Sequence, residues 1–312
     1  SPASSGAFSG SFRFHLDRKA GVVVKLEFSD LNRQVSALRY QSITASGILS
    51  PQDFLVKDTS GTVLCRNIVR QNELVYVTAP YSGVSWKVRC YFRNFPLAYL
   101  PFRVIDDPVF EMAGDSFFTA NLSAGSALQL SRPGIYFIQE DTNTLYGLTL
   151  MCFNNEFPLV TQANQLLEAT RYLTTRKEYE KLKAMPDAKD AVDHFWLETG
   201  GNYDRARMLI RSYYNRVQEA NKLYTSYLEG WKTDRGMIHL IFGKPQSIYR
   251  DEETEQWAYN GIPGFPELLF VFRKMKNPFS NNDYALIRQP VYENVWFLAV
   301  DQWRQGRVVN DN

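Results

Sequence analysis

The hydrophobic pattern of this chain changes its period near Pro158, and this change constrains the fold more than any other feature. Before that point apolar side chains alternate with polar ones, as at Val22, Val24, Leu26 and Phe28. Such alternation is typical of strands with one buried face. After it, apolar residues recur at every third or fourth position, which is the period of an amphipathic helix. The sequence therefore predicts a mixed fold, with a β region followed by helices.

Residues 8–156 are expected to form an antiparallel β-sandwich region. Turn signals rich in Asp, Gly and Pro separate the alternating runs at the short intervals that sandwiches use. About eight to ten strands would make one large sandwich or two small ones. If there are two, their seam falls at 94–115, which carries three prolines. The expected strands lie near 12–16, 22–28, 35–37, 74–77, 86–92, 135–137 and 148–150.

Residues 157–229 are expected to be helical. The pattern predicts one helix over 161–183 and a short one that Asp187 caps and the glycine pair at 200–201 closes. A third helix over 203–228 has the clearest apolar stripe in the chain. That stripe needs a cover, and the strands that follow are expected to supply it.

Residues 230–312 are expected to form a small α+β domain whose sheet packs on the third helix. A Gly/Pro turn is expected at 261–266. The predicted strands are 237–242, 255–259, 268–272 and 295–299.

The segment 229–245 passes from the third helix into an apolar run with almost no linker, so it must set the angle between two elements. Gly230 and Gly236 are interpreted as positions with unusual backbone dihedrals. Trp231 is expected to be buried as an anchor. Asp234 is expected to accept hydrogen bonds from backbone amides, from Arg235 or from another arginine.

This segment resembles the signature of the GWxTD-domain proteins of Bacteroidota, and the resemblance extends over about 133–302. It rests on Gly230-Trp231-Lys232-Thr233-Asp234-Arg235-Gly236 followed by Gly243-Lys244-Pro245. Members of that family are commonly predicted lipoproteins. The resemblance thus implies a lipid-bearing cysteine just before Ser1, with residues 1–7 as a flexible tether. The signature, to which we add Trp257, is expected to be either a structural brace or a partner contact, with bracing preferred.

Charge and hydropathy exclude two classes of partner. The chain has 35 basic and 33 acidic residues, a net charge of +2 that gives no basic field for nucleic acid. No apolar run approaches the roughly 18 residues of a membrane helix. Contact with a membrane is therefore expected only through the inferred lipid.

The sequence shows no recognised catalytic or cofactor-binding motif. His15, His194 and His239 have no second ligand or nucleophile at a recognised spacing, so no metal or cofactor is expected. The cysteines also lack metal-site spacing; a Cys65–Cys90 disulfide is conceivable, with buried thiols preferred. A carboxylate-dependent hydrolase that uses Asp234 and Glu255 remains an alternative.

The expected function is that of a non-catalytic envelope lipoprotein, a scaffold that binds other outer-membrane or periplasmic proteins. An accessory role in outer-membrane protein assembly or secretion is suggested by 242–245, 257–259 and 268–272, which are similar to small lipoproteins of the β-barrel assembly machinery. The tether lacks an acidic cluster, so the periplasmic face is favoured. A further alternative is glycan or peptide binding by the sandwich, through Tyr76, Tyr81, Trp86 and Tyr91.

Overall fold

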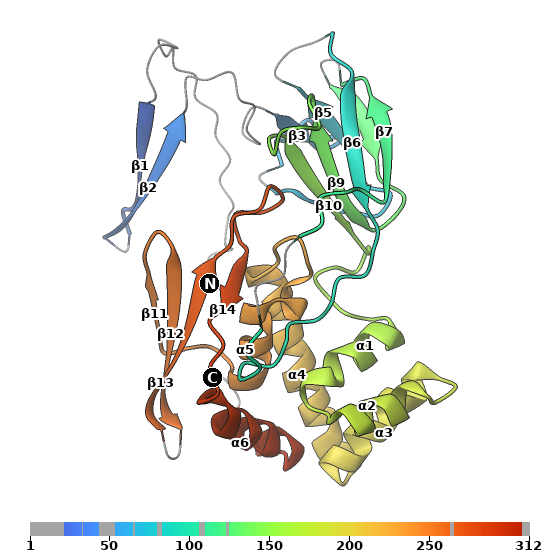
Figure 1. Ribbon diagram of the computed structural model, residues 1–312, viewed down its shortest axis with the longest axis vertical. Helices are drawn as coiled ribbons and strands as arrows, with labels where there is room; N and C mark the ends of the chain where they lie inside the picture. The colour runs from blue at the N-terminus through green and yellow to red at the C-terminus, as the bar shows by residue number, and fades with distance from the viewer. Residues whose placement is uncertain are drawn as a thin grey trace.

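The computed structural model describes residues 22–307, apart from 33, 44–53, 65, 80–82, 106–109, 123–124 and 263–264. A β-sandwich lies above a unit made of helices and a second sheet, and a separate hairpin stands beside the sandwich (Figure 1). We call the helices and the second sheet, which run from 163 to 304, the lower unit. Mixed α/β content, with strands first, helices in the centre and a sheet with helices at the end, confirms the predicted fold class. No helix among the described residues is long and apolar enough to cross a membrane.

The sandwich consists of a five-stranded sheet facing a three-stranded one. Their inner faces share one core, which includes Val56 and Val75 from the small sheet and Val88, Ile138 and Leu150 from the large one. Among the described strands, all pairs are antiparallel except β4 with β10. In the large sheet neighbouring strands follow the order β4(Ile68–Arg70), β10(Leu148–Phe153), β9(Gly134–Gln139), β6(Trp86–Tyr91), β7(Ser116–Ala120). In the small sheet the order is β3(Leu55–Lys57), β5(Leu74–Thr78), β8(Ser126–Gln129).

The predicted seam at 94–115 does not separate two sandwiches. The strands on either side of it, β6 and β7, pair with each other in one sheet. The segment instead leaves the sandwich and contacts the lower unit, where Ala98 N–H donates to Lys232 O at 3.0 Å. The remaining strands, β1(Val22–Asp30) and β2(Val35–Ile43), form a two-stranded sheet of their own. The predicted strand at 12–16 lies outside the described residues.

The helix predicted over 161–183 is broken into three pieces, α1(Ala163–Ala169), the short 3₁₀ helix η2(Thr170–Tyr172) and α2(Arg176–Lys183). Thr175 ends the interruption by capping α2, because its side chain accepts from Glu178 N–H while the Glu178 carboxylate accepts from Thr175 N–H. The apolar period continues through the break and so conceals it.

The next two helices agree more closely with the pattern. α3(Ala188–Gly200) has Asp187 as its N-cap and the left-handed Gly201 at its end, as predicted. α4(Tyr203–Leu223) buries the expected apolar face, although it ends before residue 228.

The last part of the chain forms a four-stranded antiparallel sheet, in the order β11(Ser247–Arg250), β12(Thr254–Ile262), β13(Phe265–Lys274), β14(Tyr284–Leu286). It shares a core with α4, as expected, and Tyr224 packs on Trp257 with ring centroids 5.1 Å apart. The predicted strands at 255–259 and 268–272 are confirmed, whereas β11 and β14 were not foreseen.

Two predicted strands are helices. The run at 237–242 lies in α5(Asp234–Phe242), and the run at 295–299 lies in α6(Tyr292–Arg304). Seven of the nine residues of α5 are buried, so it has no polar face from which its period could be read. A short apolar run of this kind is compatible with either structure.

An aromatic cluster joins the sandwich to the lower unit. Phe279, from the loop between β13 and β14, lies 5.1 Å from Tyr91 and 5.3 Å from Phe137, measured between ring centroids. Phe110 and Phe95 from the segment at 92–115 complete the cluster together with Tyr227. This cluster buries apolar surface from both halves, which fixes their relative position.

Candidate functional site

The signature segment forms a tight corner between α4 and α5, rather than the predicted corner between a helix and a strand. The short 3₁₀ helix η3(Gly230–Lys232) makes the turn and Thr233 begins α5. Thr233 Oγ1 accepts from Gly236 N–H at 3.1 Å and donates to Gly230 O at 2.7 Å. Thr233 is thus an N-cap with Asp234 in the first turn behind it, a helix-start signal that the sequence analysis missed.

Gly230 and Gly236 are required by close approach, which corrects their interpretation as residues with unusual dihedrals. Neither has a positive φ. A Cβ on Gly230 would lie 1.8 Å from Ala220 O, and one on Gly236 would lie 1.9 Å from Gly230 O. The glycine of the signature that does have a positive φ is Gly243, the C-cap residue of α5, with a φ of 78°.

Trp231 is fully buried, as predicted. Its backbone N–H donates to Asn221 Oδ1 at 3.3 Å, and Gly230 N–H donates to Thr225 Oγ1 at 3.0 Å. Side chains at the end of α4 therefore satisfy the corner's backbone. The Lys232 ammonium lies 5.1 Å from the centroid of the indole ring.

Asp234 connects the corner to β14 and the residues after it. Its Oδ2 accepts from Leu286 N–H at 2.7 Å, and its Oδ1 pairs with the Arg288 guanidinium. Burial raises the pKa of Asp234, and the attraction of Arg288 offsets only part of that rise. The predicted acceptor role is confirmed, with Arg288 as the arginine.

Arg235 is the buried cation of the site, with an exposed fraction of 3%. Its Nη2 donates to Asn282 O at 2.8 Å, and its guanidinium lies 4.2 Å from the Tyr284 ring centroid. It also pairs with Glu255 Oε1 at 3.4 Å. Burial lowers the pKa of Arg235, against the opposing pull of Glu255.

Glu255 is fully engaged as well. Trp257 Nε1 donates to its Oε1 at 2.6 Å, and Arg250 Nε donates to its Oε2 at 2.6 Å. Both carboxylates of the hydrolase alternative, Asp234 and Glu255, are thus buried in ion pairs and hydrogen bonds. Among the described residues, neither carboxylate lines the cavity between the sandwich and the helices or the one beside β3 and β5.

Side chains from α4 and α6 donate hydrogen bonds to the last carbonyl groups of α5. Arg216 Nη1 on α4 donates to the carbonyls of Leu240 and Ile241, each at 3.2 Å. Trp303 Nε1 on α6 also donates to Ile241 O, at 3.1 Å. These donors satisfy carbonyls that helix ends otherwise leave unpaired. Past Gly243, whose carbonyl accepts from Tyr259 O–H at 2.9 Å, the half-buried Pro245 leads the chain into β11.

Lys232, at the variable position of the signature, lies at a cavity of about 210 Å³ between the sandwich and the helices. Its ammonium pairs with Glu229 at 2.6 Å and with Glu168 at 3.5 Å. Burial alone would lower the pKa of Lys232, but the two carboxylates raise it overall. Arg93 and Phe92 also line this cavity.

The histidines and cysteines have structural surroundings. His239 is fully buried with its Nε2 3.2 Å from Glu219 Oε2, whereas His194 is exposed and 3.8 Å from Glu198. Cys90 and Cys152 are buried free thiols, and burial raises the pKa of each to about 11. His15 and Cys65 lie outside the described residues. Within the described part of the chain no three His, Cys, Asp or Glu side chains are grouped to hold a metal.

The aromatic residues proposed for glycan or peptide binding are mostly inside the fold. Trp86 and Tyr91 are fully buried and Tyr76 is half-buried. Tyr81 lies outside the described residues. Trp86 packs edge-on against Phe54, with ring centroids 5.2 Å apart, as a core residue would.

Comparison with known proteins identifies one family. The sequence model described as the GWxTD domain matches residues 134–305, which is more than half of the chain. The match begins at β9 in the sandwich and continues through the signature corner to the end of α6. No curated protein and no solved structure matches.

Proposed function

This chain belongs to the GWxTD-domain family, and from that premise we propose that it is a non-catalytic lipoprotein of the cell envelope. It acts as an interaction or scaffold subunit of an outer-membrane protein complex, with assembly or secretion of outer-membrane proteins as the process it assists. We place it on the periplasmic face of a Bacteroidota outer membrane, held by a lipid at its N-terminus.

The observation that carries the proposal is the engagement of the signature side chains inside the fold. Trp231, Thr233 and Arg235 are buried, and the side chain of Asp234 is 10% exposed. Thr233 holds the corner itself together, whereas Trp231, Asp234 and Arg235 contact other parts of the lower unit. Side chains that are held by such contacts fix the positions of the helices and strands around them. The signature therefore favours a structural role over a catalytic one. A rigid body with exposed strand edges suits a scaffold.

A pull-down from native membranes tests the proposal. The lipidated protein, tagged at its C-terminus, is recovered in mild detergent. The proteins that co-purify with it, here called its companions, are identified by mass spectrometry. We expect the same envelope proteins in every replicate and none of them with an unrelated tagged lipoprotein. A protein that is recovered alone and runs as a monomer would contradict the scaffold role.

The hydrolase alternative has a separate test. The double variant Asp234→Asn/Glu255→Gln removes both carboxylates. Hydrolysis of a peptide or glycan substrate by the native protein, lost in this variant while its fold is retained, would replace the scaffold proposal.

A further inference from the structure

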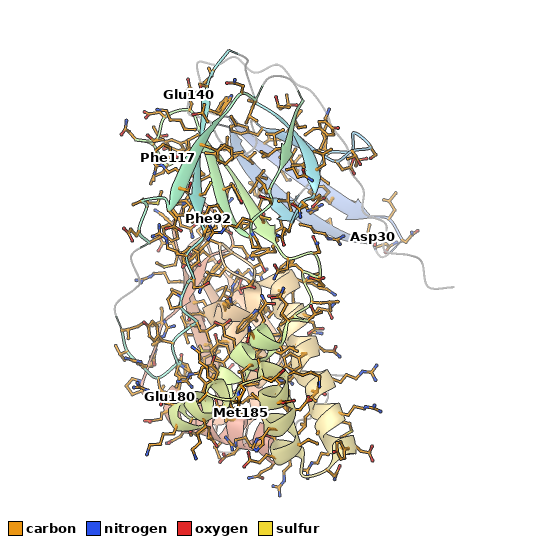
Figure 2. All side chains as sticks on the ribbon, turned by 90° about the vertical axis from the view of Figure 1, so that its right-hand side faces the viewer. Asp30, Phe92, Phe117, Glu140, Glu180 and Met185 are labelled. Carbon is orange, nitrogen blue, oxygen red and sulfur yellow. The ribbon has the colours of Figure 1, made fainter. Side chains whose placement is uncertain are left out.

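Strand β7 is an exposed edge of the sandwich. It is last in the order of the five-stranded sheet and pairs with β6 alone among the described strands. The first four of its five residues are exposed, and the exposed fractions of Phe117 and Phe118 are 83% and 40%. Phe117 lies on the outer margin of the sandwich (Figure 2).

Phe117 lies on the outer face of the sheet, opposite Arg89, whereas Phe118 lies on the inner face, opposite the core residue Val88. The strand counts of the two sheets account for the exposure of Phe118. The facing sheet has three strands against five, so the larger sheet extends beyond its cover. Natural edge strands are usually protected by charged residues or proline. The sequence of β7, Ser-Phe-Phe-Thr-Ala, contains neither. In the described part of the chain no strand other than β6 pairs with β7, so its outer edge offers backbone hydrogen-bonding groups, and β7 itself carries no charge that would repel a further strand.

The sheet surface beside this edge is positively charged. On β6, Arg89 lies opposite Phe117 and Lys87 opposite Thr119. The Arg89 guanidinium donates to the carbonyls of Met112 and Thr142, and Lys87 is exposed. Neither cation forms a salt bridge with any residue that the structure describes. A partner with negative charge at this place would be attracted by both.

We propose that β7 is a docking edge for an extended segment of a partner protein that carries an acidic residue between apolar ones. The segment adds a sixth strand to the sheet. One of its apolar side chains packs on Phe117, and its acidic side chain, opposite Thr119, faces Lys87. Neighbouring strands are about 4.8 Å apart, and the short side chain of Thr119 leaves the space between Lys87 and the new strand open. This inference rests on the proposed scaffold function and names its binding surface.

A synthetic strand tests the edge directly. The probe is the blocked heptapeptide Thr-Val-Thr-Glu-Thr-Val-Thr, whose pattern reads the same in both directions. It is titrated into the ¹⁵N-labelled full chain while amide resonances are followed. We expect shifts centred on β7 and β6, and an affinity that falls with added salt. Shifts that map elsewhere, or none at millimolar peptide, would overturn the inference.

Adding a negative charge to β7, and exchanging the charge of the peptide, supplies the decisive comparison. Thr119→Glu should weaken binding of the glutamate peptide by about fivefold to tenfold, because like charges then face each other across the pair. A second peptide, with Lys in place of Glu, should bind Thr119→Glu more tightly than the native chain. Equal affinities in all four combinations would refute charge-guided docking. Tyr249→Glu, on the exposed edge strand β11, is the matched control and should leave the peptide affinity unchanged.

The membrane pull-down separates failure of this inference from failure of the scaffold proposal. Loss of a companion with Thr119→Glu, but not with Tyr249→Glu, supports docking at β7. Companions retained equally by both variants would overturn the β7 surface and leave the scaffold proposal standing. Recovery of no companion with the native chain contradicts the scaffold itself.

Discussion

At the scale of single residues, the signature combines a large buried ring with close backbone contacts. Trp231→Ala should lower the free energy of unfolding by about 3–5 kcal/mol, since no other side chain can fill the space of a fully buried indole. Tyr203→Ala, which removes an 80% exposed ring, is the control and should change stability by no more than about 0.5 kcal/mol. Chemical denaturation measures both. Equal midpoints would show that Trp231 is not a structural anchor.

Asp234 provides a second test at this scale, because its partner is also a buried charge. Asp234→Ala leaves the Arg288 guanidinium without its carboxylate, and loss of one member of a buried pair costs about 3–5 kcal/mol. The double variant Asp234→Leu/Arg288→Met removes both charges and should recover part of that loss. A double variant less stable than Asp234→Ala in urea would argue against this pairing.

Asp283 should give the protein a distinctive dependence on pH. Burial raises its pKa to about 6, against the donated hydrogen bond of Asn277. The native state therefore holds this proton more tightly than the unfolded chain, so its contribution to stability is full below about pH 4 and is lost as the pH rises to 6. Asp283→Asn should be more stable than the native chain at pH 7, by about 2 kcal/mol, with the difference vanishing near pH 4. Urea midpoints across pH 4–7 measure it, and a constant difference would contradict the assignment.

At the scale of elements, α5 depends on its first residue. Thr233→Ala removes the acceptor for Gly236 N–H and the donor to Gly230 O, and should cost about 1–2 kcal/mol. Thr233→Ser keeps the hydroxyl and is the matched control. Hydrogen exchange should show faster opening of the α5 amides in the Ala variant than in the Ser variant. Identical exchange in both would mean that the cap does not hold the helix.

At the scale of the whole molecule, the aromatic cluster around Phe279 determines whether the two halves behave as one body. Phe279→Ala removes ring contacts to Tyr91, Phe110 and Phe137 at once. We expect calorimetry to show a single transition for the native protein and two for the variant, because the sandwich and the lower unit retain separate cores. Phe117→Ala, an exposed ring on the same sandwich, should leave a single transition. Two transitions in the native protein would show that the halves are already independent.

How much of this was accessible from the sequence differs between elements. Strands with one solvent-facing side, such as β5 and β6, and the amphipathic α4 were predictable because their environment differs on two sides and leaves a period in the sequence. α5 was not, since it is buried nearly all round. The signature residues could be singled out from the sequence, yet their partners Arg288, Asn282 and Tyr284 lie about 50 residues further along the chain and carry no local signal.

The sequence by itself therefore determined the mixed class of the fold, the order of its parts, the family, the burial of Trp231 and the acceptor role of Asp234. Those properties follow from local patterning and from the chemistry of single side chains. Only the tertiary structure decided why Gly230 and Gly236 are glycines, which arginine binds Asp234, and that the segment at 92–115 ties the sandwich to the signature corner. These depend on atoms that meet across long stretches of chain, and a contact of that kind is set by packing rather than by any neighbouring residue.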